Sequence, residues 1–176
     1  GTPAAAVFWV DTDDHDWEEV RTATVLNASL EIRTLALRDL PGAGTQPVAS
    51  LVLDDSVAGL HSALEAALLP TEFTADVMAG LRRHYRSGTR VATAFAGWLD
   101  DLLGHQGLVV FEGADPAARP LVADLWTREL DRPCRTAELA REAGAAMNRM
   151  GHKPQVEPAD DSVALFYVDA AGRRPI

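Results

Sequence analysis

Residues 5–19 read AAVFWVDTDDHDWEE, an apolar run followed directly by a dense acidic cluster. The first six residues include no polar side chain, which is the pattern of a strand covered on both faces of a parallel sheet. The residues after them favour a short helix, because Asp16 followed by Glu19 fits an N-cap with a capping glutamate. A buried strand that leads into a helix start indicates an α/β protein.

A second apolar run, LVVF within residues 107–112, predicts a parallel neighbour of the first strand. Between the two runs, residues 29–53 predict two or three strands, of which 50–53 (SLVL) is the clearest. Apolar side chains at helical spacing then predict three helices between residues 55 and 104. The expected starts are near Val57, at Thr71 after a proline, and at Thr89.

The last third of the chain predicts two more helices and a hairpin. Asp115 followed by Pro116 is a strong helix start, and this helix should bury Leu121, Val122, Leu125 and Trp126. The next helix should be capped by Thr136 and end at Gly151. Alternation over 163–169, a turn at 170–172 and the residues from 173 onward predict a β-hairpin. The order of elements indicates an α/β sheet with an inserted helical layer.

Composition limits the classes of function. With 176 residues the chain is about one domain long, and its 16 basic and 26 acidic residues give a net charge of −10. This charge argues against nucleic acid or an anionic membrane as the main partner. The single cysteine, Cys134, excludes an internal disulfide framework and any multi-cysteine metal site. No apolar run is long enough to span a bilayer, and no basic segment begins a signal peptide, so we expect a cytoplasmic protein.

Both ends of the chain suggest a piece of a longer protein. The sequence begins without methionine and enters an apolar strand almost at once. It stops at Ile176, directly after a turn signal that should start another strand. We therefore expect the fold to be incomplete at both ends and this piece alone to be inactive.

The acidic cluster is the strongest candidate site. Ligands of open parallel sheets bind beyond the carboxyl ends of the strands, and this cluster directly follows the carboxyl end of the first predicted strand. Asp13, Asp14 and Asp16 offer carboxylates for a cation or an amine, and His15 offers an imidazole for proton transfer. Helix capping and first-turn acids are the alternative explanation, which would make this a non-catalytic α/β domain.

A second enzymatic interpretation starts from the same strand. VFWVDTD at residues 7–13 also resembles the first motif of haloacid-dehalogenase-type phosphotransferases, with Asp11 as the nucleophile. Asp54 and Asp55 could imitate that family's acidic metal motif. Against this, the residues after the motif are Asp-His, and the only lysine, Lys153, lies far beyond the place where the family needs one.

The order of motifs resembles one family along nearly the whole chain. FWVDTDDHDWEEV at residues 8–20 is similar to the signature of the cysteine-adding enzymes of bacillithiol synthesis, the BshC family, in which a Phe-Trp strand precedes Glu-Asp-His-Asp, an aromatic residue and Glu-Val. The later blocks that match in order are Tyr85, Gly88, Ala94-Phe95, Leu102-Leu103-Gly104, 107–110, Asp115-Pro116, 125–130, Gly151, Gln155-Val156, Leu165-Phe166 and 172–174. Three places depart from the pattern: Thr12 replaces glycine, Asp13 replaces glutamate, and 152–154 lacks the usual aromatic residue.

This resemblance implies a Rossmann-like parallel sheet with an inserted helical segment and a C-terminal β-hairpin. Residues 1–176 would form part of that core, with 21–104 as an inserted connecting segment. The upstream half of the core, with its Gly-Gln-Gln loop, and the downstream coiled coil through which family members dimerise are absent from this sequence.

The resemblance also implies an activity. Family members join L-cysteine to the amino group of glucosaminyl malate, an amide ligation for which ATP is the expected activating cofactor and Mg²⁺ a companion ion. Asp14, His15 and Asp16 would be the catalytic residues. Asp13, Trp17 and Gln155 would bind substrate, and no residue is assigned to a protein-held metal.

Overall fold

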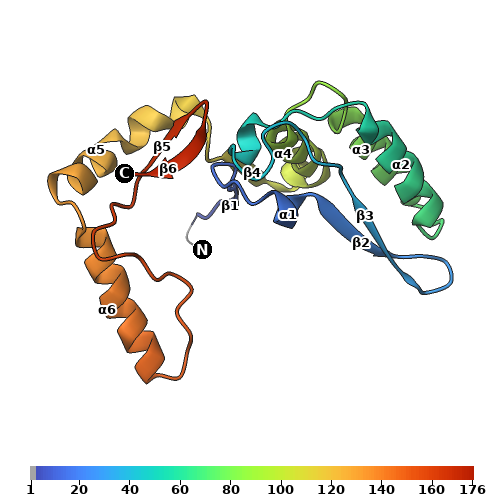
Figure 1. Ribbon diagram of the computed structural model, residues 1–176. Helices are drawn as coiled ribbons and strands as arrows, with labels where there is room; N and C mark the ends of the chain where they lie inside the picture. Colours follow the sequence, from blue (N-terminus) through green and yellow to red (C-terminus); the bar gives the residue numbers. More distant parts are fainter. Residues whose placement is uncertain (1–2) are drawn as a thin grey trace. The chain divides into compact units, whose positions relative to one another are not determined.

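The computed structural model describes residues 3–176, apart from the side chain of Arg173. The chain forms two compact units, the first ending at Ala114 and the second beginning at Asp115. Figure 1 shows the elements of both units coloured along the sequence. No helix within the described residues is long and apolar enough to cross a membrane.

The two apolar runs pair as expected in the first unit. β1 (Ala6–Val10) and β4 (Leu108–Glu112) are parallel, in a register that extends from Ala6 opposite Leu108 to Val10 opposite Glu112. This arrangement confirms the prediction that 5–10 and 107–112 are neighbouring parallel strands. Parallel strands need a crossover connection. Residues 11–107 form this connection, which leaves the sheet after β1 and returns to it at β4.

That segment contains a hairpin and three helices. The short helix α1 (Trp17–Val20) leads into β2 (Thr22–Leu26), which pairs with β3 (Ile32–Ala36) in an antiparallel hairpin. Helices α2 (Ser56–Ala67), α3 (Thr74–His84) and α4 (Val91–Leu103) follow, and Figure 1 shows them grouped beside the base of this hairpin. The three helices are those expected from the apolar spacing, although α3 and α4 begin two or three residues late.

The core of the first unit lies among these elements rather than on the sheet. Its buried side chains come from α1, from the segment between β3 and α2, and from the first turns of α2 and α4: Trp17, Leu37, Leu40, Val48, Leu51, Leu53, Val57, Val91 and Ala94. This cluster includes the aromatic residue of the acidic motif. The core therefore fixes the segment that follows β1.

The prediction of a strand at 50–53 is wrong. Val48–Ser50 is a single 3₁₀ turn, and Val52 makes only an isolated bridge with Arg90. The backbone of Leu51 and Leu53 bonds to the segment that leads into α4, with Val91 N–H donating to Leu51 and Leu53 N–H donating to Thr89. Because that partner segment turns into a helix immediately, the pairing cannot extend into a ladder. The strand Thr22–Leu26, in contrast, had no counterpart among the predictions.

The expectation that the first strand is covered on both faces is also wrong for this chain. Phe8 packs on Phe95 of α4, with ring centroids 5.8 Å apart. Val7 and Trp9 alternate to the other face of the strand and are 57% and 62% exposed. A sheet of two strands has too few packed neighbouring elements to bury both of its faces. The apolar pattern of β1 therefore predicts more burial than this strand has in the first unit.

The second unit contains α5 (Arg119–Asp131), α6 (Arg135–Arg149) and the hairpin β5 (Phe166–Asp169) with β6 (Gly172–Pro175). The hairpin confirms its prediction. The helix start at Asp115 is also present, as a 3₁₀ turn at Pro116–Ala118 whose first free N–H donates to the Asp115 carboxylate. No strand forms at Gln155-Val156.

Two details of this unit differ from the sequence prediction. Leu121, Leu125 and Trp126 are exposed on α5, Leu121 by 83%, so the apolar stripe of this helix is not covered within the described structure. Thr136 does not cap α6. Its hydroxyl donates to Glu129 of α5, and Cys134, in the left-handed backbone region, takes the capping position. Glu129 also accepts the Ala164 N–H, which ties the segment before β5 to the two helices.

The buried cluster of the first unit predicts a clear difference in stability between two leucine substitutions. Leu53 is 1% exposed, and Leu53→Ala should lower the free energy of unfolding by about 2–5 kcal/mol through the lost contacts and the cavity. Leu69→Ala, at a half-exposed position in the same unit, should change it by less than about 0.5 kcal/mol. Urea titrations followed by far-ultraviolet circular dichroism measure both. Equal losses would show that this cluster is not the core.

Candidate functional site

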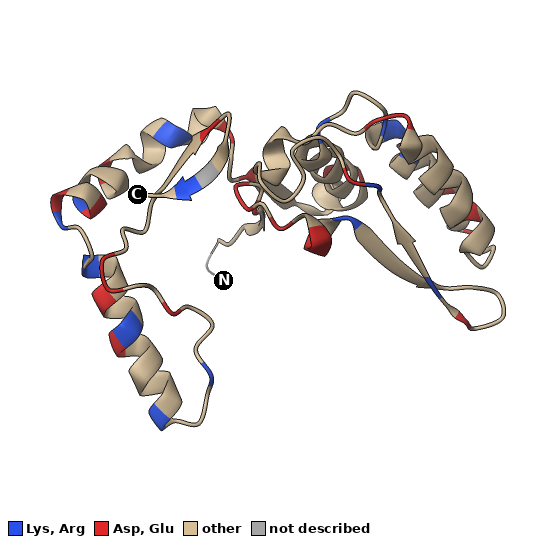
Figure 2. Cartoon of the chain, viewed as in Figure 1, with Lys and Arg blue, Asp and Glu red and all other residues tan. Residues whose placement is uncertain are grey.

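The acidic motif forms one wall of an open cleft in the first unit. One wall consists of residues 14–18, and the facing wall consists of Asp39, Leu40 and residues 42–45. The cleft has a volume of about 770 Å³, which is in the range of small-molecule sites. Figure 2 shows acidic positions in red along the segment that leads from β1 into α1.

Thr12 fixes the start of the acidic wall. It is 2% exposed, and its hydroxyl accepts the Ala114 N–H that follows β4, at 3.3 Å. Its carbonyl accepts the Ala49 N–H at 3.0 Å, and the Asp14 carbonyl accepts the Val48 N–H at 2.8 Å. The chain is therefore bonded on both sides as it leaves the sheet, and residues 14–16 emerge from a rigid base.

Asp14 and His15 form a local pair on this wall. Asp14 Oδ1 accepts the backbone N–H of His15 at 2.7 Å and lies 3.1 Å from the His15 Nδ1 atom. Because a carboxylate only accepts hydrogen bonds, this contact places the ring proton on Nδ1. The other ring nitrogen, Nε2, is then the proton-accepting atom of the neutral imidazole.

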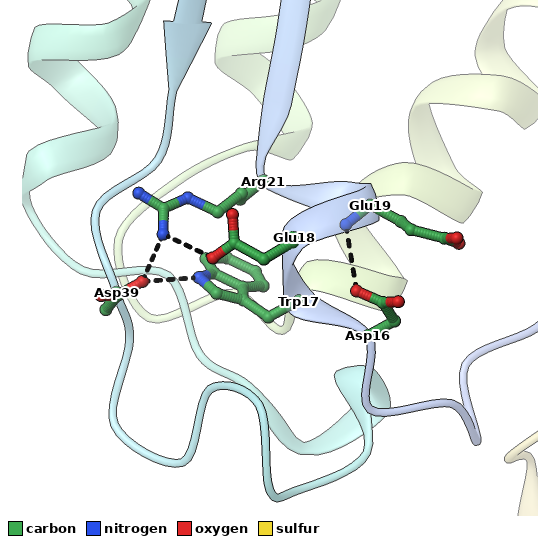
Figure 3. A network of polar contacts seen from close by, with 6 residues as sticks. All are labelled: Asp16, Trp17, Glu18, Glu19, Arg21 and Asp39. Carbon is green, nitrogen blue, oxygen red and sulfur yellow. Dashed lines mark hydrogen bonds and ion pairs between the residues drawn. The ribbon is translucent and has the colours of Figure 1, made fainter.

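Asp16 and Trp17 attach the same wall to the fold. Asp16 Oδ1 accepts the Glu19 N–H at 3.3 Å, which is the N-cap of α1 that the sequence predicts (Figure 3). Trp17 is 3% exposed and belongs to the core, although it is also one of the residues that line the cleft. Its buried indole N–H donates to Asp39 Oδ1 at 3.1 Å.

Asp39 was not identified from the sequence, and it connects the two walls. Its Oδ1 atom accepts from Trp17 and also from Arg21 Nη1, at 2.6 Å, and Arg21 bonds Glu18 at 3.0 Å (Figure 3). The loop after Asp39 turns through Gly42 and Gly44, both with positive φ. This turn carries the second wall past the first.

The remaining predicted site residues lie elsewhere. Asp13 is exposed and does not line the cleft, and Gln155 belongs to the second unit. Asp11, the nucleophile of the phosphotransferase interpretation, lines a separate hollow of about 700 Å³ between β1, the hairpin and α2–α4. Asp54, of the supposed metal motif, is bound by Arg38, and this ion pair lowers the pKa of its carboxyl group to about 2. These positions do not bring the phosphotransferase residues together.

The hollow beside Asp11 is mainly apolar. Its lining includes Tyr85, whose burial raises the pKa of the phenol to about 12, so the hydroxyl stays neutral. It also includes His61, where burial and the neighbouring Arg82 lower the pKa of the imidazole.

The charges of the cleft favour a cationic ligand. Its lining includes Asp14, Asp16, Glu18 and Asp39, of which Glu18 and Asp39 share Arg21 as an ion-pair partner, and the described residues that line it include no lysine or arginine. A ligand amine would be attracted there, since like-charged walls focus the field inside a cleft. Residues 3–176 contain no group of three histidine, cysteine or acidic side chains placed to hold a metal ion. The arrangement suits binding and deprotonation of an amine.

The fold and the site together define a Rossmann-like α/β domain with a His-carboxylate cleft at the carboxyl end of a parallel strand. Residues 2–176 match the family model described as bacillithiol biosynthesis BshC, N-terminal Rossmann-like domain. The chain belongs to this family.

Curated relatives agree with this placement. A protein of Salinibacter ruber is 33% identical over 175 residues, and one of Symbiobacterium thermophilum is 31% identical over 185. A relative from Bacillus licheniformis is 24% identical over 165 residues, and all three are named "Putative cysteine ligase BshC". These alignments cover 94–98% of this chain but only 30–33% of the relatives, so the chain spans about a third of their length.

The cap at Asp16 can be separated from any chemical role of its carboxylate. Asp16→Ala should lower the free energy of unfolding by about 1 kcal/mol, whereas Asp16→Asn should change it by a few tenths at most, because asparagine caps a helix about as well. Thermal unfolding of both variants measures this difference. An equal loss in both would mean that the charge of Asp16, rather than its cap, supports α1.

Proposed function

We propose that this chain is part of a cysteine ligase of bacillithiol biosynthesis, which forms an amide between L-cysteine and the amino group of glucosaminyl malate. The observation that supports it is the Asp14–His15 pair on the wall of an acidic cleft. The family and the names of the relatives give the reaction class, and the cleft supplies groups that such a reaction needs.

His15 takes the role of general base in this proposal. An ammonium group cannot attack a carboxyl carbon until it loses a proton, and the Nε2 atom of His15 is the accepting nitrogen of the neutral ring. Asp14 holds the ring through Nδ1 and stabilises the imidazolium that forms. The ammonium releases its first proton to solvent; as the new C–N bond then closes, a second amine proton passes to His15 and the activating group leaves with its electron pair.

The other acidic residues hold the amine. Asp16 faces the cleft with one oxygen engaged as the cap of α1, and the substrate ammonium is attracted by the remaining carboxylate charge. Trp17 also lines the cleft. Asp13 and Gln155 stay proposed substrate contacts without an assigned geometry, since neither lines this cleft.

ATP remains the proposed activating cofactor, with Mg²⁺ as its companion. The cleft itself does not fit a triphosphate, because its described lining is acidic and contains no basic side chain. Mg²⁺ in such reactions is bound by one or two carboxylates together with the phosphates. We therefore assign the amine to this cleft and no phosphate-binding step to these residues.

The proposal extends to the whole protein in two respects. A cytoplasmic location suits a chain with one cysteine and a biosynthetic role. A homodimer formed through a coiled coil outside this chain is part of the same proposal. A non-catalytic role remains the second candidate, favoured by the capping contact between Asp16 and Glu19.

Removal of His15 tests the proposed function. In the full-length protein, His15→Ala should lower the rate of cysteine addition to glucosaminyl malate by about 100-fold or more, the usual scale for a lost general base. His105→Ala is the matched control, since His105 is an exposed histidine of the same unit outside the cleft. Product formation is measured by mass spectrometry. Full activity of His15→Ala would leave the non-catalytic role as the better account.

A further inference from the structure

Asp39 is the side chain through which the second wall of the cleft holds the first. One oxygen, Oδ1, accepts from Trp17 Nε1 at 3.1 Å and from Arg21 Nη1 at 2.6 Å. The two donors flank α1, with Trp17 at its first residue and Arg21 directly after its last. The Asp39 carboxylate therefore accepts hydrogen bonds from the first residue of this one-turn helix and from the residue just after its last, as Figure 3 shows.

Both donors depend on this acceptor. Trp17 is 3% exposed, and its indole N–H donates to Asp39, so removal of Asp39 takes away the acceptor of a buried donor. The buried Nε atom of Arg21 has no hydrogen-bond partner within residues 3–176 as the structure describes them, so its guanidinium is already under-satisfied. Its Nη1 atom is shared between Asp39 and Glu18, and Glu18 is itself a residue of α1. Loss of Asp39 would leave Arg21, among the described residues, with the carboxylate of Glu18, which belongs to the helix that Arg21 helps to hold.

The helix α1 cannot keep its position alone. It has four residues, and helices shorter than about 12 residues are marginal in water without tertiary contacts. The segment before it is held at Asp14 by the Val48 N–H, a backbone contact that side-chain substitution leaves intact. At the other end the Arg21 carbonyl accepts the Leu37 N–H at 2.8 Å, and Asp39 adds the side-chain contacts to Trp17 and Arg21. His15 and Asp16 lie between these two attachments, so their positions depend on both.

We propose that Asp39 is a positioning residue for the amine-binding cleft, and that it acts by fixing His15 and Asp16 through Trp17 and Arg21. This inference rests on the proposed function, because it names a residue that supports the same site. The position of a general base affects rate strongly, and a displacement of about 1 Å can lower it 100-fold. Asp39 should therefore affect the chemical step more than substrate affinity.

Two substitutions separate the parts of this contact. Asp39→Asn keeps an oxygen that accepts from Trp17 but loses the charge that pairs with Arg21, whereas Asp39→Ala loses both. In the full-length protein we expect Asp39→Ala to lower kcat by about 100-fold, with a KM for the amine substrate within about twofold of wild type. The kcat of Asp39→Asn should lie between the values of Asp39→Ala and the wild type. If Asp39→Ala unfolds, the same split between kcat and KM is measured on Asp39→Asn.

Asp54→Asn is the matched control. It removes the carboxylate that pairs with Arg38 in the same unit, and Asp54 does not line the cleft. Its kcat and KM should stay within about twofold of wild type. A wild-type kcat in both Asp39 variants would overturn the inference. So would an unchanged kcat with a raised KM, because Asp39 would then bind the amine directly.

Nuclear magnetic resonance separates this inference from the proposed function. The Trp17 indole signal and the His15 ring signals should shift in Asp39→Ala but not in Asp54→Asn. Wild-type protein that adds no cysteine would contradict the proposed function, and shifted His15 signals in Asp39→Ala would still support the positioning role. Unshifted His15 signals would overturn that role whatever the activity.

Discussion

The buried Thr12 is the point on which the first unit depends. Its carbonyl and hydroxyl join the end of β1 to the 3₁₀ turn at Val48–Ser50 and to the residue pair that follows β4. The two strands and the start of the core are therefore locked at one residue. A threonine here supplies a hydroxyl acceptor that a glycine would lack. The acidic segment begins immediately afterwards, so its direction is set by this junction.

In the cleft that follows this junction, some side chains hold the walls in place and others are the proposed chemical groups. Trp17 and Arg21 attach the acidic wall to Asp39, while Asp14 orients His15. Asp16 serves both, since one oxygen caps α1 and the group faces the cleft. This division explains how four carboxylates can lie around one cleft. Asp39 is neutralised by Arg21, and Asp14 and Asp16 each satisfy a backbone N–H.

The sequence was most informative where local patterns decide structure. Apolar runs predicted the β1–β4 pair, helical spacing predicted α2–α4, and the Asp16–Glu19 spacing predicted the cap. Sequence patterns did not predict the parts of the structure that depend on contacts between residues far apart in the chain. Asp39 meets Trp17 across 22 residues, and no local pattern marks that meeting. Leu51 and Leu53 are buried as a strand would be, but their backbone partner turns into α4 instead of continuing a ladder.

The most direct test of the central claim is a crystal structure of the full-length protein with glucosaminyl malate bound. The account predicts that the substrate amine lies between residues 14–18 and the Asp39–Thr45 wall. Its nitrogen should be about 3 Å from the His15 Nε2 atom, within reach for proton transfer. An amine bound elsewhere, with His15 facing only solvent, would contradict the claim that this cleft is where the amide is made.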